Sequence, residues 1–418
     1  MTGPERSTAN PFVALRATVV VAGMYLLAFI AWWASGERWP QQRWFGVHLF
    51  TLGIVTNLIL ALSSHFARTL THQGGRPRSQ ALLVSNAGIV ALLVGIPTDT
   101  RWLVALGAIA LATEVTRSLL ELRRLRRHAL AGRFAWIVRS YEHAHGALLL
   151  GAILGALLGI GLLAAQWSSW VRLAHLYLNV LGWAGLTLLA TVVFFGPTTM
   201  RTRIRPGADE RASRWLPRAA AALVVAAAAL ILTGLDGAAG TAFRLVAAGA
   251  LAVYALSVAQ VCLPVIQAAR TARATAARGG IVGACLWFIA VSAADVLLVA
   301  TAGWRFLDAI GLAMLVGVLF QAIASSIAYF APLLVDPSRT ERRSARIERL
   351  DRTPGFRTFA WNAGAGLVVA AAPTGPVGGV VGSAAARAGW AIVIAGAVSL
   401  AVAVLVPTTP LGGTADAG

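Results

Sequence analysis

Histidine is the residue type in this sequence best suited to metal chemistry. Seven histidines occur, and five of them lie within or beside long apolar runs: His48, His65, His143, His145 and His175. Paired imidazoles on facing helices can bind haem iron axially or a copper ion. The histidines therefore suggest one or two metal or haem centres, and whether they pair depends on the elements that carry them.

These elements are apolar enough to need lipid as solvent. Of 418 residues, 58% are hydrophobic and 12% are charged, and one soluble core could not bury so large an apolar fraction. The net charge of +19 comes from arginines in short loops between apolar runs. That distribution sets membrane topology and argues against a nucleic-acid partner. We expect a multi-pass protein of the plasma membrane, with the lipid bilayer as its main partner.

Apolar runs of about 20 residues, the length that crosses a bilayer, occur about twelve times. They begin near Ala17, Phe45, Gln80, Arg101, Tyr141, Val171, Pro217, Ala242, Ile281, Trp304, Phe356 and Ala388. The sequence therefore predicts an all-α polytopic membrane helix bundle. Its single transmembrane domain spans residues 17–406, between a cytoplasmic segment at 1–16 and a cytoplasmic tail at 407–418.

The arginines predict the orientation of the bundle, because cytoplasmic loops carry the excess of positive charge. Loops after the even-numbered predicted helices are basic, for example at Arg68 and at Arg123–Arg127. Both ends of the chain are therefore expected in the cytoplasm. His48 and His175 then lie near the outer ends of helices two and six. His65, His143 and His145 share a depth near the inner face.

The two depths define two candidate cofactor sites. His48 and His175 are the candidate metal ligands, and Asn179, one helical turn after His175, is a candidate group for orienting it. His65, His143 and His145 form the second candidate group. A straight helix turns about 260° between His48 and His65, so the two do not share one face. The alternative for both groups is hydrogen bonding to loop carbonyls and lipid headgroups.

Four other side chains at membrane depth raise smaller questions. Glu114 has Arg117 three residues later, a spacing at which the two charges can neutralise each other. Asp295 has no basic partner within its own helix, so a proton or cation role is possible. Cys262 and Cys285 lie within apolar segments and imply no disulfide framework. We interpret both cysteines as packing residues.

Several segments resemble a known family. They read RWFGVHLFTLG at 43–53, SHFA at 64–67, HLYLNVLGWAGLT at 175–187, PTTMRTR at 197–203 and YFAP at 329–332. These segments resemble actinobacterial membrane proteins whose membrane part is often fused to multicopper-oxidase or copper nitrite-reductase-like cupredoxin domains. The resemblance covers about helices two to ten. It implies an extracytoplasmic cupredoxin or multicopper oxidase as partner, because this chain contains no cupredoxin domain.

The pattern His-x-x-Leu-Asn-x-x-Gly-Trp from His175 to Trp183 is more remotely similar to haem-copper oxidase subunit I and to nitric-oxide-response haem-copper membrane proteins. Those proteins are also twelve-helix bundles, so the resemblance implies an oxidase-like arrangement. The chain departs from them because no histidine follows His175, and Phe195 stands where a histidine often closes the motif. It is therefore not expected to be a complete terminal oxidase on its own.

The leading hypothesis is a redox subunit that binds haem b, copper or both, and serves a copper oxidoreductase. A proton- or ion-coupled transporter that uses Asp295 and Glu114 is the first alternative. A membrane assembly factor without a cofactor is the second. Whether the chain is itself an enzyme stays open at this point.

Overall fold

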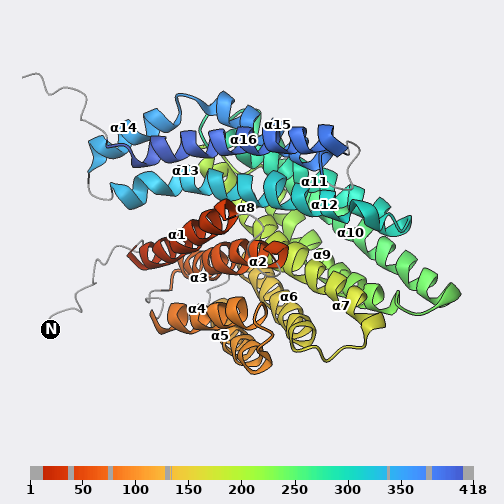
Figure 1. The fold of residues 1–418 in the computed structure, drawn as a ribbon. Helices are drawn as coiled ribbons and strands as arrows, with labels where there is room; N and C mark the ends of the chain where they lie inside the picture. Colours follow the sequence, from red (N-terminus) through yellow and green to blue (C-terminus); the bar gives the residue numbers. More distant parts are fainter. Residues whose placement is uncertain are drawn as a thin grey trace, which may run out of the picture. The chain divides into compact units, whose positions relative to one another are not determined.

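The computed structural model describes residues 13–35, 42–73, 79–127, 132, 134–336, 339–372 and 379–407, and all regular structure among them is helical (Figure 1). The chain divides into two compact units, residues 1–187 and 188–418. The first unit contains α1 (Val13–Ala34), α2 (Gln42–His48), η1 (Leu49–Thr56), α3 (Asn57–Leu70), α4 (Ser79–Gly95), α5 (Arg101–Arg127), α6 (Ala135–Ile160), α7 (Ala165–Tyr177) and η2 (Leu178–Gly185).

The boundary between the units falls within α8 (Leu186–Thr199). The second unit continues with α9 (Ala208–Leu232), α10 (Gly237–Ala269), α11 (Arg278–Ala300), η3 (Trp304–Phe306), α12 (Leu307–Leu312), η4 (Ala313–Phe320), α13 (Gln321–Val335), α14 (Thr340–Leu350), α15 (Pro354–Ala370) and α16 (Gly379–Leu405). Neighbours in sequence pack as hairpins in each unit, for example α4 with α5 in the first and α10 with α11 in the second.

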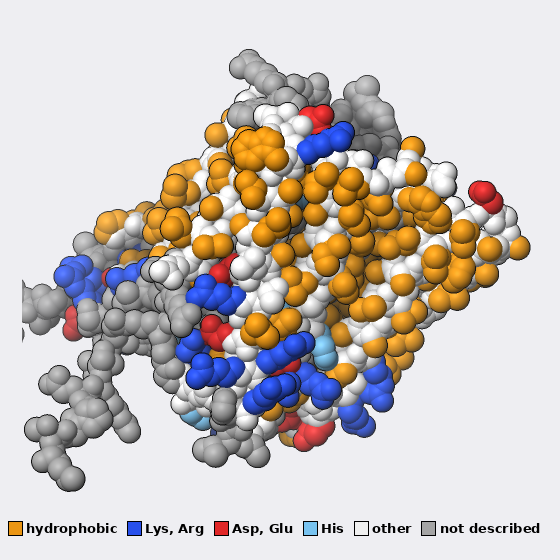
Figure 2. Space-filling model, turned by 90° about the horizontal axis from the view of Figure 1, so that it is seen from below, with side chains coloured by type: hydrophobic (Ala, Val, Ile, Leu, Met, Phe, Trp, Pro, Cys, Tyr) orange, Lys and Arg blue, Asp and Glu red, His pale blue; other side chains and the backbone are white. Residues whose placement is uncertain are grey.

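The chain is an all-helical, multi-pass membrane protein. Ten helices in the described part of the chain are long and apolar enough to cross a bilayer. Large apolar side chains on their surfaces are more than half exposed, among them Leu106 and Ile109 on α5 and Ile153 on α6. Hydrophobic side chains cover most of the face in Figure 2, while basic side chains gather in one part of it. Lipid is the solvent that such a surface needs.

The predicted count of twelve spans and some predicted boundaries differ from these helices. α4 and α15 contain 17 residues each, the lower limit for a span, so the count of twelve stays a prediction. α1 begins at Val13, four residues before the expected start. Residues 1–12 and 408–418, most of the two predicted cytoplasmic ends, lie outside the described residues. Arg123–Arg127 form the last turns of α5 and not a loop, which corrects the expectation.

Three continuous helices contain an eight-residue π-helical segment. η1 joins α2 to α3, η2 joins α7 to α8, and η4 joins α12 to α13. In a π turn the hydrogen bond reaches one residue further along the chain than in an α turn, and such turns are frequent at functional sites. Neither composition nor apolar periodicity distinguishes these segments from ordinary helix, so the sequence did not predict them.

Candidate functional site

The first unit brings His48 and His175 together, as their matched depths led us to expect. Their ring centroids are 6.4 Å apart, and the ring planes differ by 23°. Both side chains are partly buried. The indole of Trp44 stacks on the imidazole of His48, with 4.2 Å between the two ring centroids. The sequence analysis did not include Trp44 in the site, although its position one turn before His48 makes the contact possible.

Backbone carbonyl groups orient both imidazoles. His48 Nδ1 lies 2.8 Å from the carbonyl oxygen of Trp44, and His175 Nδ1 lies 2.7 Å from that of Gly151. A carbonyl oxygen only accepts, so each Nδ1 must carry the proton and donate it. The Nε2 atom of each neutral ring then carries the lone pair that a metal ion would use.

Asn179, the candidate orienting group, lies beside His175. Its Nδ2 donates to the carbonyl oxygen of His175 at 2.7 Å and lies 3.2 Å from His175 Nδ1. The second contact is secondary, because a protonated Nδ1 that donates to Gly151 cannot also accept from an amide. Asn179 therefore stabilises the backbone of the helix at His175, and its amide does not donate to the protonated ring nitrogen.

Two glycines of α6 leave the space in which these side chains lie. A β-carbon at Gly155 would lie 2.7 Å from Cε1 and 2.9 Å from Nδ1 of His175. A β-carbon at Gly151 would lie 2.5 Å from Nδ2 of Asn179. Gly151 and Gly155 lie four residues apart on α6, so they form a ridge of small residues along that helix. The structure shows that the ridge also forms the wall against which His175 and Asn179 rest.

Both histidines lie at the start of a π segment. His48 directly precedes η1, and His175 lies one turn before η2 begins. The two segments are also linked, because Trp183 Nε1 in η2 donates to Thr56 Oγ1 in η1 at 3.2 Å. The wide turns and this bond set the rotation of both helices at the histidines.

The residues present fit a group held by two imidazoles. Two imidazoles that bind one metal ion from opposite sides, with metal–nitrogen bonds of about 2 Å, have ring centroids roughly 6 Å apart. The observed centroid separation is close to that value, and the two rings are nearly parallel. Within the described residues, no group of three or more His, Cys, Asp or Glu side chains is placed to hold a metal ion. A haem would require only these two protein ligands, because its porphyrin would supply the other four nitrogens.

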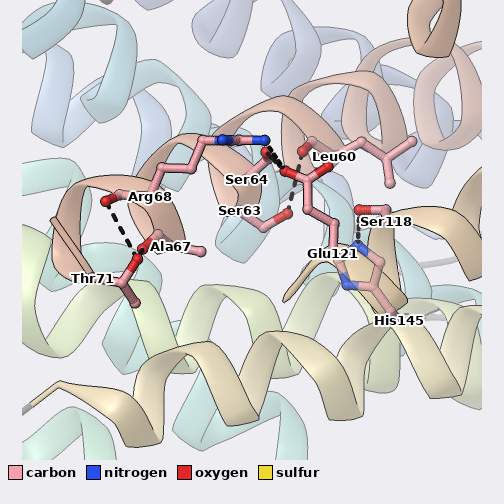
Figure 3. A network of polar contacts seen from close by, with 9 residues as sticks. All are labelled: Leu60, Ser63, Ser64, Ala67, Arg68, Thr71, Ser118, Glu121 and His145. Atoms are coloured by element: carbon pink, nitrogen blue, oxygen red, sulfur yellow. Dashed lines mark hydrogen bonds and ion pairs between the residues drawn. The ribbon is translucent and has the colours of Figure 1, made fainter. Parts of the chain in front are cut away.

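The predicted inner group is different. His145 is fully buried, its Nδ1 donates to the Tyr141 carbonyl at 2.7 Å, and its Nε2 lies 2.9 Å from Ser118 Oγ (Figure 3). The edge of its ring contacts Trp183 at 4.8 Å between centroids. Both nitrogens of His145 are therefore used within the protein, which favours a structural role for it.

His65 and His143 keep less defined roles. His65 is partly buried on α3, and His143 Nδ1 on α6 is buried with no hydrogen-bond partner among the described residues. η1 lies between His48 and His65, and a π turn contains more residues than an α turn, so the rotation of about 260° expected for a straight helix does not apply. That the two histidines lie on different faces of their helix stays a prediction.

The structure places an ion-pair network beside the inner histidines that the sequence analysis missed. Arg68 and Ser64 of α3 converge on Glu121 of α5, at 2.5 Å and 3.2 Å from its Oε1 (Figure 3). Arg126 of α5 forms two bonds with Glu142 of α6, at 2.5 Å and 3.2 Å. The two arginines had been assigned to loops but lie in the last turns of α3 and α5, and the two glutamates had not been considered.

The other two candidate charged residues, Glu114 and Asp295, lie on helices of different units. Glu114 is 3.7 Å from Arg117 on α5, which supports the neutralising pair predicted from their spacing. Asp295 is 4% exposed on α11 in the second unit.

No family model, curated protein or solved structure matches this chain. Its function is therefore inferred from the residues and their geometry.

Proposed function

We propose that this chain is a membrane redox subunit that holds a haem b, or else a copper ion, between His48 and His175. The observation that carries the proposal is the pair of near-parallel imidazoles 6.4 Å apart, each donating from Nδ1 to a backbone carbonyl. When bound, such a group supplies one-electron transfer. The carbonyl bonds keep each Nε2 free and make it more basic, as is usual for metal-binding histidines.

The neighbouring residues would hold the pair in place. Gly155 leaves room for the His175 ring, and Trp44 covers one face of the His48 ring. Because the backbone of α6 contributes the Gly151 carbonyl, α6 and α7 must stay packed for His175 to keep its orientation. The site thus depends on packing within the first unit alone.

The proposal includes twelve spans in the plasma membrane with both chain ends in the cytoplasm. In that topology the histidine pair lies near the outer face, where an extracytoplasmic cupredoxin or multicopper oxidase would receive electrons or metal. The absence of any histidine after His175 leaves no set of ligands for an oxygen-reducing centre of the oxidase type. The chain would therefore act with a separate copper oxidoreductase and not as an oxidase itself.

An optical spectrum tests the proposal directly. Detergent-purified protein is measured oxidised and then reduced with dithionite, and iron and copper are quantified on the same sample. We expect sharp reduced haem bands that are lost in His48→Ala and in His175→Ala. His65→Ala, on the same continuous helix as His48, is the matched control and should keep the bands. A colourless, metal-free protein would overturn the redox proposal.

A second candidate function is proton- or ion-coupled transport, favoured by the burial of Asp295 within a membrane helix. A buried carboxyl at this depth is costly unless it serves a partner or a pathway. In reconstituted vesicles, Asp295→Asn would abolish ion-coupled uptake if the transport candidate is correct. An unchanged uptake rate in Asp295→Asn, together with intact haem bands, would exclude the transport function and retain the redox function.

A further inference from the structure

The chain contains only two cysteines, and the second unit brings them together. Cys262 lies on α10 and Cys285 on α11, two helices that pack as a hairpin. Each cysteine is seven residues from the loop-facing end of its helix, so the two share one depth. Both cysteines line the same small cavity beside these two helices. Our interpretation as unrelated packing residues is therefore incomplete.

The surroundings of the two thiols are apolar. Both line a small cavity of about 10 Å³, together with Leu189, Val192, Ile281 and Phe288. The two cysteines are 1% and 3% exposed. The next residues along each helix, Leu263 and Leu286, are 42% and 52% exposed on the apolar surface. The thiols are thus shielded from water, and they lie on two helices whose outer faces carry exposed apolar side chains.

Two neighbouring thiols can bind a metal ion as thiolates or form a disulfide, and the apolar environment favours one of these reactions. A metal ion bound by two thiolates would bury charge among apolar side chains, which is costly without a compensating partner. The cavity lining contains no charged side chain, and the described residues offer no third ligand beside the pair. A disulfide carries no charge and has no polar hydrogen to satisfy. The surroundings therefore favour the disulfide over a metal thiolate.

We propose that Cys262 and Cys285 form a reversible disulfide within the membrane, with a lipid-soluble quinone as the oxidant. One S–S bond forms and two S–H bonds break. The two electrons and two protons pass to the quinone, which becomes the quinol. The disulfide then joins α10 to α11 covalently, so the second unit changes its covalent structure with the redox state of the quinone.

The test uses full-length protein in lipid vesicles and duroquinone as the probe. After incubation the protein is denatured with N-ethylmaleimide present, and its adducts are counted by intact mass spectrometry. We expect two adducts before oxidation and none after it, with both restored by dithiothreitol. Quinol should form at one equivalent per protein, as followed by ultraviolet absorbance.

Two variants separate the disulfide from other oxidation. Cys262→Ser and Cys285→Ala should each give one adduct before and after quinone, with no covalent dimer on a non-reducing gel. His175→Ala should form the disulfide as readily as the original chain, because the histidine pair plays no part in it. Two adducts that persist after quinone treatment, or a mass increase from quinone addition to a thiol, would overturn the proposal.

Discussion

Gly155 shows how closely the candidate site depends on single residues. Its missing side chain leaves the space occupied by the His175 ring, whose Cε1 would lie 2.7 Å from an added β-carbon. Real β-carbons do not approach a ring atom so closely, so the imidazole would have to move. The Nδ1 bond to Gly151, at 2.7 Å, would be strained or lost with it. The position of His175 is therefore decided as much by α6 as by its own helix.

Gly155→Ala should weaken haem or metal binding by roughly tenfold or more, the usual effect of disturbing groups behind a ligand. The measurement is a titration of the purified apoprotein with haem, followed by the reduced spectrum. Gly146→Ala is the matched control, because nothing lies within 4 Å of the added carbon on the same helix. The control should bind normally and gain up to about 1 kcal/mol in helix stability. Equal binding by both variants would contradict the role of Gly155.

The ion pair between Arg126 and Glu142 should contribute to stability. Glu142 is 8% exposed and accepts two bonds from the guanidinium of Arg126. Glu142→Gln should lower the free energy of unfolding by about 1.5–3 kcal/mol, the range for hydrogen bonds to charged groups. Unfolding of purified protein in mixed micelles, followed by circular dichroism, measures it.

Glu114→Gln is the comparison for that ion pair. Its partner Arg117 is 3.7 Å away and 40% exposed, so the change should be under about 1 kcal/mol. A loss as large as that of Glu142→Gln would show that burial and not pairing controls both effects.

At the scale of elements, the π segments set the faces that meet. η1 lies between His48 and Asn57, and Asn57 is held by two reciprocal hydrogen bonds to Asn86 of α4, at 3.0 Å and 2.9 Å. These bonds connect α3 to α4. Because these bonds fix α3 against α4, deleting or inserting a residue in η1 must rotate the part of the helix before η1, which carries His48.

Deleting Thr51 from η1 should therefore rotate His48 away from His175 by about 100°, the turn of one helical residue. We expect the haem bands to disappear while the protein still inserts and purifies as the original chain does. The optical spectrum and size-exclusion profile measure the two effects. Deleting Val318 from η4 is the control, because η4 lies in the other unit and should leave the bands intact. Bands that survive the first deletion would contradict the pairing of the histidines.

At the scale of the whole molecule, the arginines predict which loops face the cytoplasm. The loop between α8 and α9 carries Arg201, Arg203 and Arg205, whereas that between α9 and α10 carries only Asp236 as a charge. Arg201 also pairs with Asp351 at 3.1 Å, so both residues must lie on one side of the membrane. The positive-inside rule then assigns that side to the cytoplasm.

Labelling of intact cells with a membrane-impermeant maleimide tests this orientation. Asp236→Cys should be labelled, and Arg205→Cys should be labelled only after the cells are opened. Cys262 and Cys285 are buried and should stay unlabelled in both variants. The opposite pattern would place the histidine pair at the cytoplasmic face and remove the extracytoplasmic partner from the proposal.

Some features of the site followed from sequence because they depend on depth. The position of His48 and His175 along their helices, the small residues of α6 and the Glu114–Arg117 spacing could all be read along the chain. The structural role of His145 could not be predicted from the sequence, since it depends on hydrogen bonds to Ser118 and Tyr141 that form only when particular helix faces meet. Arg126 and Glu142 were missed for the same reason. Which faces meet depends on helix rotation, and η1 and η2 alter that rotation without a local signal.

The sequence by itself determined that this protein is helical and lies in a membrane, because the transfer of apolar runs into lipid depends only on composition and length. It also predicted the depths of His48, His65, His143, His145 and His175, since depth follows from counting along a helix. Only the tertiary structure decided that His48 meets His175, that Gly155 makes room for the ring, and that Cys262 and Cys285 line the same cavity. The physical reason is that such contacts arise from the packing of neighbouring helix faces, which involves residues far apart in the chain.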